Sequence, residues 1–304
     1  MGPLLFLLYI NDLQYAISLA QTRLFADDTP VLLKGKNLKD LKGKADDTLA
    51  ELSKWFLLNK MSLSLNKSNF ILFHGIRKDP CLDFNTLGNG TNSIHRVKSC
   101  KYVGLTIDET LSWNEHINNL CKSLTKFFSV FYNIRNIVDL NLARTIYYAC
   151  IYSRIKYGIE IYGSASNNKL SKIQTLQNKL MKLITCKPPR YSTNQLHTDL
   201  KILQVRDIYE MSLLQFTFNC VNGNSIVNFS EFFQFQENVH GHNTRHKRQI
   251  TRHRIKTEKG RTTTHYAGAT LWNTLPTEIT QSKTIKSFKR KLFAKYLSEY
   301  SVQQ

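Results

Sequence analysis

Acidic residues are scarce in this chain of 304 residues. Its 22 Asp and Glu stand against 42 Lys and Arg, which gives a formal net charge of +20 and a sequence pI near 9.7. A surplus of this size favours a polyanionic partner, because each neutralised phosphate releases counterions and strengthens binding at low salt. We therefore expect a nucleic acid as partner, with a membrane surface as the weaker alternative.

Several other features are missing from the sequence. The six cysteines form no Cys-x-x-Cys pair, which argues against a zinc knuckle or a disulfide framework and favours an intracellular location, nuclear or cytoplasmic. No internal repeat or low-complexity tract is visible. The apolar segment from Leu4 to Ile10 is too short to span a membrane and lacks the basic start of a signal peptide, so we expect neither membrane insertion nor secretion.

The most informative stretch is Phe25-Ala26-Asp27-Asp28, in which two adjacent carboxylates lie between apolar runs. The pattern over residues 22–33 predicts a strand, a tight turn and a second strand, with both carboxylates at an exposed corner. Mg²⁺, or Mn²⁺ in its place, is bound by a few carboxylates plus substrate phosphates, as in two-metal phosphoryl transfer. From these residues alone, a metal-binding turn for nucleotidyl transfer and an ordinary polar turn both remain open.

The same letters recur at Ala45-Asp46-Asp47-Thr48, where the surroundings differ. Apolar residues at steps of three and four predict an amphipathic helix from about Leu38 to Lys60. Asp46 and Asp47 fall off its apolar stripe among lysines, so we expect them on a solvated helix face. Context, rather than the dipeptide, makes Asp27 and Asp28 the candidate metal ligands.

The remaining pattern predicts an α+β fold. The expected elements are a buried helix at 4–20, strands at 62–66 and 69–73 joined by a turn at Asn66-Lys67-Ser68, a loop at 75–93, a strand pair at 97–107, and then mainly helices, including 140–156, 168–185 and a final amphipathic helix. Lys187-Pro188-Pro189-Arg190 interrupts the helices and is a plausible domain boundary.

Two groups of basic residues are candidates for phosphate contact. The helix predicted at 168–185 carries Lys169, Lys172, Lys179 and Lys182. These lysines either contact phosphates or, as is more usual, form a solvated helix face. The segment 240–261 carries a denser run, opposed only by Glu258, which predicts a nucleic-acid footprint or, for part of it, a nuclear-import signal. Its members are Arg245, Lys247, Arg248, Arg252, Arg254, Lys256, Lys259 and Arg261.

Read in order, several motifs resemble the reverse transcriptases of non-LTR retrotransposons. They are Gly2-Pro3-Leu4-Leu5-Phe6 with Tyr9-Ile10-Asn11-Asp12-Leu13, then Phe25-Ala26-Asp27-Asp28, Trp55 through Asn66-Lys67-Ser68, Tyr102-Val103-Gly104-Leu105 and Leu111-Ser112-Trp113-Asn114-Glu115. The later Leu271-Trp272-Asn273-Thr274-Leu275-Pro276 is similar to the carboxyl-terminal region of the jockey-like and CR1-like branch. The resemblance thus covers nearly the whole chain.

This resemblance implies an RNA-directed DNA polymerase and a role for particular residues. Asp27 and Asp28 would hold Mg²⁺, Ala26 would lie under the primer end, and Lys67 would protonate the leaving pyrophosphate. Tyr102 and Gly104 would belong to the primer grip, and the partners would be an RNA template, a DNA primer and a dNTP. The implied domains are a partial palm of antiparallel strands with helices at 1–108, a helical thumb at 109–190 and a small basic carboxyl-terminal region at 191–304.

In this family another metal-binding aspartate and the fingers precede the Gly-Pro-Leu-Leu-Phe segment, inside which this chain begins. We therefore expect an amino-terminally truncated fragment that does not extend a primer by itself, because rates of phosphoryl transfer depend on complete positioning of the reacting groups. The alternatives are a non-catalytic nucleic-acid-binding protein and a non-functional relic of a retroelement.

Overall fold

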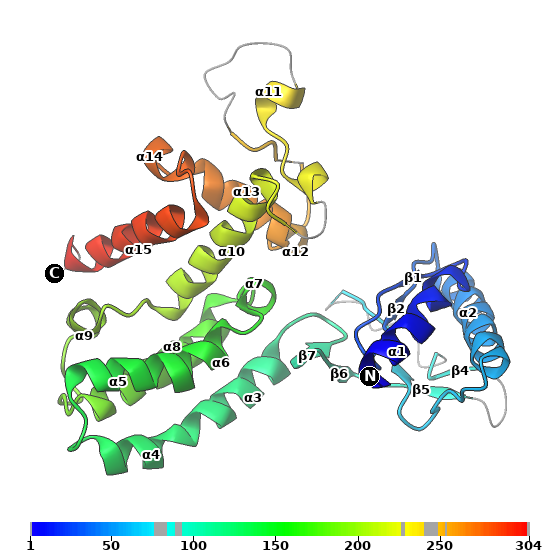
Figure 1. The fold of residues 1–304 in the computed structure, drawn as a ribbon, viewed down its shortest axis with the longest axis horizontal. Helices are drawn as coiled ribbons and strands as arrows, with labels where there is room; N and C mark the ends of the chain where they lie inside the picture. Colours follow the sequence, from blue (N-terminus) through cyan, green and yellow to red (C-terminus); the bar gives the residue numbers. More distant parts are fainter. Residues whose placement is uncertain are drawn as a thin grey trace. The chain divides into compact units, whose positions relative to one another are not determined.

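The computed structural model describes residues 2–75, 84–88, 93–225, 229–239, 249–252 and 254–302. The chain divides into two compact units, Met1–Trp113 and Asn114–Gln304. Figure 1 shows small strands only in the first unit and a helical second unit, so the fold is α+β as the sequence predicts. No helix in the described part of the chain is both long and apolar enough to cross a membrane.

The first unit is organised around one long helix, α2 (Leu38–Leu58). Asn37 caps this helix, since its side-chain Oδ1 accepts a 2.8 Å hydrogen bond from the Asp40 N–H, and the Asp40 carboxylate accepts one of 2.8 Å from the Lys36 N–H. This reciprocal arrangement satisfies backbone donors at the helix start. The segment before it forms α1 (Gly2–Ile10) and a 3₁₀ turn, η1 (Asn11–Tyr15).

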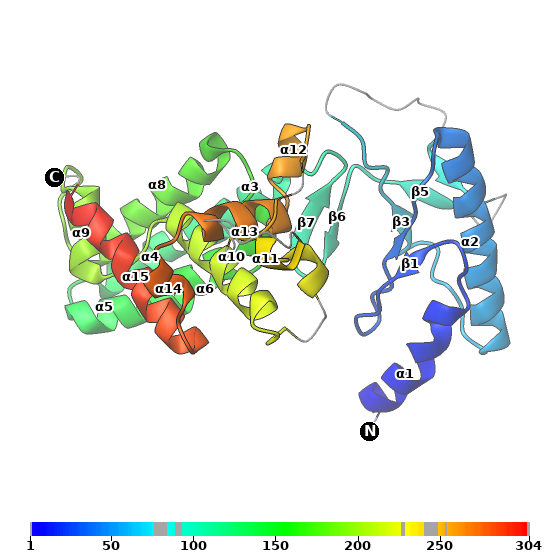
Figure 2. The same ribbon diagram turned by 90° about the horizontal axis from the view of Figure 1, so that it is seen from above.

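The first unit also holds three short sheets, and in both views α2 runs beside the first two of them but not the third (Figures 1 and 2). In the first, β1 (Gln21–Thr22) pairs antiparallel with β2 (Val31–Leu32). In the second, β5 (Ile94–Arg96) lies between β4 (Thr86–Leu87), which is antiparallel to it, and β3 (Asn69–Phe70), which is parallel. The third is the antiparallel hairpin of β6 (Ser99–Tyr102) and β7 (Leu105–Asp108).

Two apolar clusters on α2 fix the position of the hairpin of β1 and β2, which carries Asp27 and Asp28 and is called the acidic hairpin below. Ile10, Leu13 and Ile17 pack with Trp55. The half-buried Leu24, which follows β1, also packs on this cluster. Leu33, after the second strand, packs on the other cluster, whose buried members are Ala45, Leu49, Leu72, Phe84, Leu87 and Ile94. Both ends of the hairpin are therefore attached to α2 through apolar packing, while the four residues of its turn, 25–28, are exposed.

The second unit is a set of packed helices. Its elements are α3 (Asn114–Thr125), α4 (Phe127–Ile134), α5 (Leu140–Tyr147), the π-helical turn η2 (Tyr148–Tyr152), α6 (Ser153–Lys156), α7 (Ile159–Tyr162), α8 (Asn167–Ile184), α9 (Thr193–Leu200), α10 (Val205–Val221), η3 (Ser230–Phe232), α11 (Gln236–Val239), α12 (Glu258–Arg261), α13 (Thr264–Asn273), α14 (Thr277–Thr280) and α15 (Ile285–Val302). The helix α8 packs against α3 and α4, and α10 packs against α13 and α15.

Polar groups are buried among these helices. Gln177 on α8 is fully buried and donates to the Tyr147 hydroxyl at 2.7 Å and to the Leu203 carbonyl at 2.8 Å. His197 is also fully buried, with Nδ1 2.9 Å from the Ile202 carbonyl and Nε2 3.0 Å from Asn178 Oδ1. These bonds tie α8 to the segment between α9 and α10, so residues on both sides of position 190 share one unit.

The structure corrects four predictions about local structure. The segment 4–20 is not a buried helix: Leu4 and Leu8 are 62% and 68% exposed, because only the face bearing Phe6, Ile10, Leu13 and Ile17 packs inward. Residues 62–66 form no strand, and the predicted loop contains β4. The strands are not all antiparallel, since β3 and β5 run parallel.

Candidate metal-binding turn and nucleic-acid interface

The turn at Ala26-Asp27 is the tightest possible connection within the acidic hairpin. Phe25 and Asp28 exchange two backbone hydrogen bonds, each of 3.0 Å, so only two residues lie between them. Ala26 has φ of +52°, and Asp27 is not among the residues with positive φ. A positive φ at the first central residue alone is typical of a type II′ turn, which usually places glycine there. Ala26 therefore holds a conformation that costs about 1 kcal/mol.

Both carboxylates of this turn face solvent. Phe25, Ala26, Asp27 and Asp28 are all exposed. Within the described parts of the chain, neither Asp27 nor Asp28 makes a side-chain hydrogen bond or ion pair. Two unengaged carboxylates are hard oxygen ligands of the kind that Mg²⁺ prefers, with water and phosphates completing the coordination. The two carboxylates are therefore the right type of ligand for Mg²⁺. Among the described residues, no group of three or more His, Cys, Asp or Glu side chains is placed to hold a metal ion.

The second Ala-Asp-Asp-Thr sequence lies in α2, as expected, but one of its aspartates binds the backbone of a distant loop. Asp47 is exposed, as predicted for a solvated face. Asp46 is half-buried, and its Oδ1 accepts a 2.9 Å hydrogen bond from the Gly88 N–H, where the backbone has φ of +85°. The prediction of a solvated face was therefore wrong for Asp46, because a loop distant in sequence folds back onto it.

Lys67 lies in a turn, as the sequence predicts. The Ser64 carbonyl accepts hydrogen bonds from the Lys67 N–H at 3.1 Å and from the Ser68 N–H at 3.0 Å, and the Lys67 side chain is exposed. The turn precedes β3, so Lys67 and the acidic turn belong to different sheets. Strand pairing does not bring Lys67 to Asp27 and Asp28.

Val103 and Gly104 form the two-residue turn between β6 and β7, and Tyr102 comes directly before it. Val103 has φ of +44° and Gly104 has φ of +77°, which is the pattern of a type I′ turn. Gly104 suits this geometry, whereas a β-branched residue such as Val103 adopts it only under strain. Tyr102 is half-buried and Gly104 is exposed, so the turn presents bare backbone to solvent.

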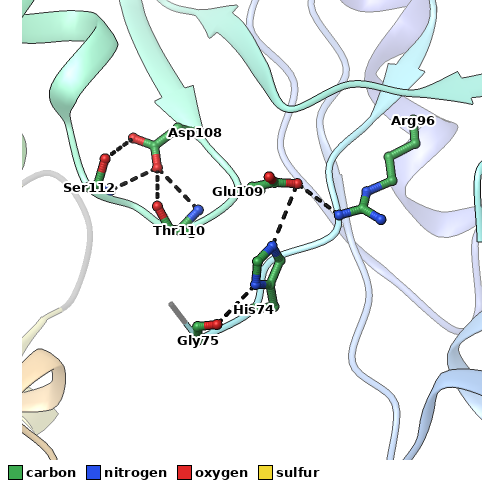
Figure 3. A network of polar contacts seen from close by, with 7 residues as sticks. All are labelled: His74, Gly75, Arg96, Asp108, Glu109, Thr110 and Ser112. Atoms are coloured by element: carbon green, nitrogen blue, oxygen red, sulfur yellow. Dashed lines mark hydrogen bonds and ion pairs between the residues drawn. The ribbon is translucent and has the colours of Figure 1, made fainter. Parts of the chain in front are cut away.

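Sequence reasoning missed the carboxylate that fixes the end of this hairpin. Asp108 accepts five hydrogen bonds at 2.7–3.2 Å, from the N–H groups of Thr110, Ser112 and Trp113 and from the hydroxyls of Thr110 and Ser112. Figure 3 shows the bonds from Thr110 and Ser112. Burial favours the neutral acid, but the bonds from Ser112, Thr110 and Trp113 outweigh it and lower the pKa of Asp108. The spacing Asp-x-Thr-x-Ser, typical of a side chain that caps a turn, was the available signal.

A half-buried ion pair lies next to this carboxylate. Arg96 of β5 donates to Glu109 Oε2 at 2.8 Å, and His74 Nε2 lies 3.6 Å from the same oxygen, which is longer than a hydrogen bond (Figure 3). The three side chains are only 12–18% exposed. The backbone reinforces the link, since the His74 N–H donates to the Glu109 carbonyl at 3.1 Å. These contacts connect the β6–β7 hairpin to the sheet that contains β5.

The second unit presents the predicted basic residues at its surface. Lys172 and Lys179 are exposed on α8, and Arg252 and Arg254 are exposed after the isolated bridge between Phe235 and Ile250. Asn273 anchors this bridge: its Oδ1 accepts from the Ile250 N–H at 2.8 Å and its Nδ2 donates to the Ile250 carbonyl at 2.9 Å. The remaining two predicted contacts, Arg245 and Arg248, lie outside the described residues.

Comparison with known proteins supplies the context for these features. Over 216 residues, or 68% of this chain, the sequence is 28% identical to the probable RNA-directed DNA polymerase from transposon X-element of Drosophila melanogaster. It is 25% identical over 217 residues to the RNA-directed DNA polymerase from mobile element jockey of the same species, and 27% identical over 218 residues to that of Drosophila funebris.

The match covers 68% of this chain but 23% of each of these three relatives, so the chain spans about a quarter of their length. No protein-family model matches the chain. No solved structure matches it either. The chain is therefore a sequence relative of the RNA-directed DNA polymerases of non-LTR retrotransposons, the family that its ordered motifs resemble.

Proposed function

We propose that this chain contributes the metal-binding turn, the primer-contacting hairpin and the thumb to an RNA-directed DNA polymerase of a non-LTR retrotransposon. The observation that carries the proposal is the pair of exposed, unengaged carboxylates at the strained two-residue turn of Ala26 and Asp27. In this assignment the palm lies in the first unit, and the helices from α3 to α8 form the thumb. The whole polymerase would transfer dNTPs to a DNA primer on an RNA template.

Each residue of the turn has a stated role in this proposal. Asp27 and Asp28 would hold Mg²⁺, or Mn²⁺, which when bound neutralises charge on the reacting phosphates. The small Ala26 side chain leaves room above the turn for the end of the primer. On the second hairpin, the exposed backbone of Gly104 permits close approach of primer phosphates beside the Tyr102 ring. Lys67 carries an exposed ammonium group that would donate a proton to the leaving pyrophosphate.

Localised cleavage of the primer tests this function. Fe²⁺ replaces Mg²⁺ at the site, and hydroxyl radicals generated with peroxide then cut a labelled DNA primer on an RNA template. We expect cuts within a few nucleotides of the primer 3′ end, lost in D27N/D28N. The matched control is D46N/D47N, which makes the same two changes in the second Ala-Asp-Asp-Thr sequence, within α2. This variant should leave the cuts in place. Uniform cutting along the primer, or cuts that persist in D27N/D28N, would reject the proposal.

A second candidate is nucleic-acid binding without catalysis, favoured by the exposed Lys172, Lys179, Arg252 and Arg254. Counterion release predicts an affinity for RNA or primer–template that falls steeply with salt. Replacing Arg252 and Arg254 by glutamine should weaken binding and flatten its salt dependence, whereas alanine at Asp27 and Asp28 should leave it nearly unchanged. The reverse outcome in a fluorescence anisotropy titration would exclude this candidate.

The expectation that the chain does not extend a primer by itself stays a prediction. Its measurement is a primer-extension assay with Mg²⁺ and with Mn²⁺ on a primed RNA template. Clear product from the purified chain would overturn it.

A further inference from the structure

One side of the continuous helix from α5 through η2 to α6 carries two tyrosines with a cationic side chain on either side of them, at steps of four residues. These are Arg144, Tyr148, Tyr152 and Lys156, hereafter the ladder. The Arg144 guanidinium carbon lies 5.6 Å from the centre of the Tyr148 ring, and the Lys156 ammonium lies 5.8 Å from that of Tyr152. The two rings are 5.0 Å apart at 63°. Each side chain therefore touches the next one in the ladder.

The ladder borders the exposed side of the helix. All four of its side chains are half-buried. The residues that directly follow the first three of them, Thr145, Ala149 and Ser153, are exposed. The Thr145 hydroxyl donates back to the Asn141 carbonyl at 3.0 Å, so it does not reach outward. Small side chains next to the tyrosines leave part of the rings accessible to another molecule.

The tyrosine pair is held in place by the fold. The Tyr148 hydroxyl donates to the Lys201 carbonyl at 3.1 Å, which links the ladder to the end of α9. Burial, with smaller contributions from Tyr148 and Glu160, raises the pKa of Tyr152 to about 12, so its phenol stays neutral near pH 7. The pair coincides with the π-helical turn Tyr148–Tyr152, and such turns within α-helices occur frequently at functional sites.

The surrounding charge favours a polyanion. Between residues 114 and 190 the sequence has twelve Lys and Arg against three Asp and Glu. Cations alone would attract any phosphate backbone, but aromatic faces add stacking that only unpaired bases can accept. Arginine and lysine beside such rings provide phosphate contacts and cation–π contacts together.

We propose that the ladder Arg144-Tyr148-Tyr152-Lys156 binds an unpaired stretch of single-stranded nucleic acid, with bases against the two rings and phosphates at the two cations. Arg144 and Lys156 are twelve residues apart, about 18 Å along a helix at about 1.5 Å per residue. That length matches about five stacked nucleotides at about 3.4 Å each. The proposal relies on the function proposed above only for the class of partner.

Binding of short oligonucleotides tests the ladder. Fluorescence anisotropy would compare labelled 12-nucleotide single-stranded RNA, the corresponding DNA, and an RNA–DNA duplex of the same length. We expect Tyr148→Leu with Tyr152→Leu to weaken single-strand binding about tenfold or more, from the usual contribution of base stacking, and to leave duplex binding within about twofold. Tyr148→Phe with Tyr152→Phe keeps both rings and should bind like the original chain. The RNA and DNA arms decide which single strand is preferred.

Tyr132→Leu is the matched control, because Tyr132 is 56% exposed and lies under Arg135 at 4.0 Å but outside the ladder. Its affinity should not change. The proposal is overturned if the double leucine variant binds single strands normally, or if single-strand and duplex binding fall equally. It is also overturned if Tyr132→Leu has the same effect.

Crosslinking of the original chain keeps the proposal testable if the leucine variants do not fold. A 5-bromouridine RNA, irradiated in complex with the chain and digested with trypsin, should label the peptide Thr145–Arg154, which contains both ladder tyrosines. Label confined to other peptides would contradict the proposal. This result does not depend on metal at Asp27 and Asp28, so it can fail separately from the polymerase assignment.

Discussion

Replacing Asp108 by alanine should destabilise the first unit more than any other exposed or half-buried acidic substitution there. The carboxylate accepts five hydrogen bonds from three residues that follow β7. A hydrogen bond contributes about 1 kcal/mol net, which sets an upper value near 5 kcal/mol, and partial exposure reduces the expected loss to about 2–4 kcal/mol. The same bonds hold Leu111 at φ of +51° and Trp113 at +63°, conformations that are otherwise unfavourable.

Urea unfolding of the full chain, followed separately for each unit by hydrogen exchange, measures this loss. Asp47→Ala is the matched control, since Asp47 is exposed on α2, and it should change the unfolding free energy by less than about 0.5 kcal/mol. The pKa of Asp108 is lowered on folding, so its stabilisation is present above the unfolded pKa near 3.8 and disappears as the pH falls through the folded value. A loss as small as that of Asp47→Ala would refute the role assigned to Asp108.

Two further predictions concern the turn and the second unit. Ala26→Gly should raise the unfolding free energy by about 0.5–1 kcal/mol, because glycine adopts positive φ without strain, while Ala26→Val should lower it; equal values for both would contradict the turn geometry. Burial raises the pKa of Asp207 to about 6, although the Tyr300 hydroxyl donates to it, and burial lowers the pKa of His197 to about 4. Stability from Asp207 is present below pH 3.8 and lost as the pH rises through 6, whereas that from His197 is present above pH 6.5 and lost toward 4. As the pH falls from 6.5 to 4, the unfolding free energy of Asp207→Asn in urea should therefore decrease more steeply than that of the original chain. An unchanged pH profile would refute the opposing contributions of Asp207 and His197.

Elements with strong local signals could be predicted from the sequence. The apolar period of α2 and the turn-forming residues of the two hairpins determine those elements within a few residues of their observed ends. Exposure of Asp27 and Asp28 follows from the same local chemistry. The proposal that they bind a metal came from the resemblance to a family, because two carboxylates at a turn are compatible with several functions.

Features that depend on distant contacts could not be predicted. The hydrogen bond from Gly88 to Asp46 joins residues 42 positions apart, and the ion pair of Arg96 with Glu109 depends on how two sheets meet. Periodicity also fails for α1, whose apolar residues surround the helix, so the pattern does not tell which of them pack inward. Burial of Gln177 and His197 likewise requires partners from other helices.

Metal binding at the acidic turn is the central claim, and paramagnetic broadening by Mn²⁺ tests it most directly. In an amide-resolved NMR spectrum of the isotopically labelled chain, substoichiometric Mn²⁺ should broaden the signals of residues 25–29 before those of residues 45–48, and excess Mg²⁺ should reverse the effect. D27N/D28N should abolish it. Broadening that is equal at the two Ala-Asp-Asp-Thr segments, or that survives D27N/D28N, would contradict the account.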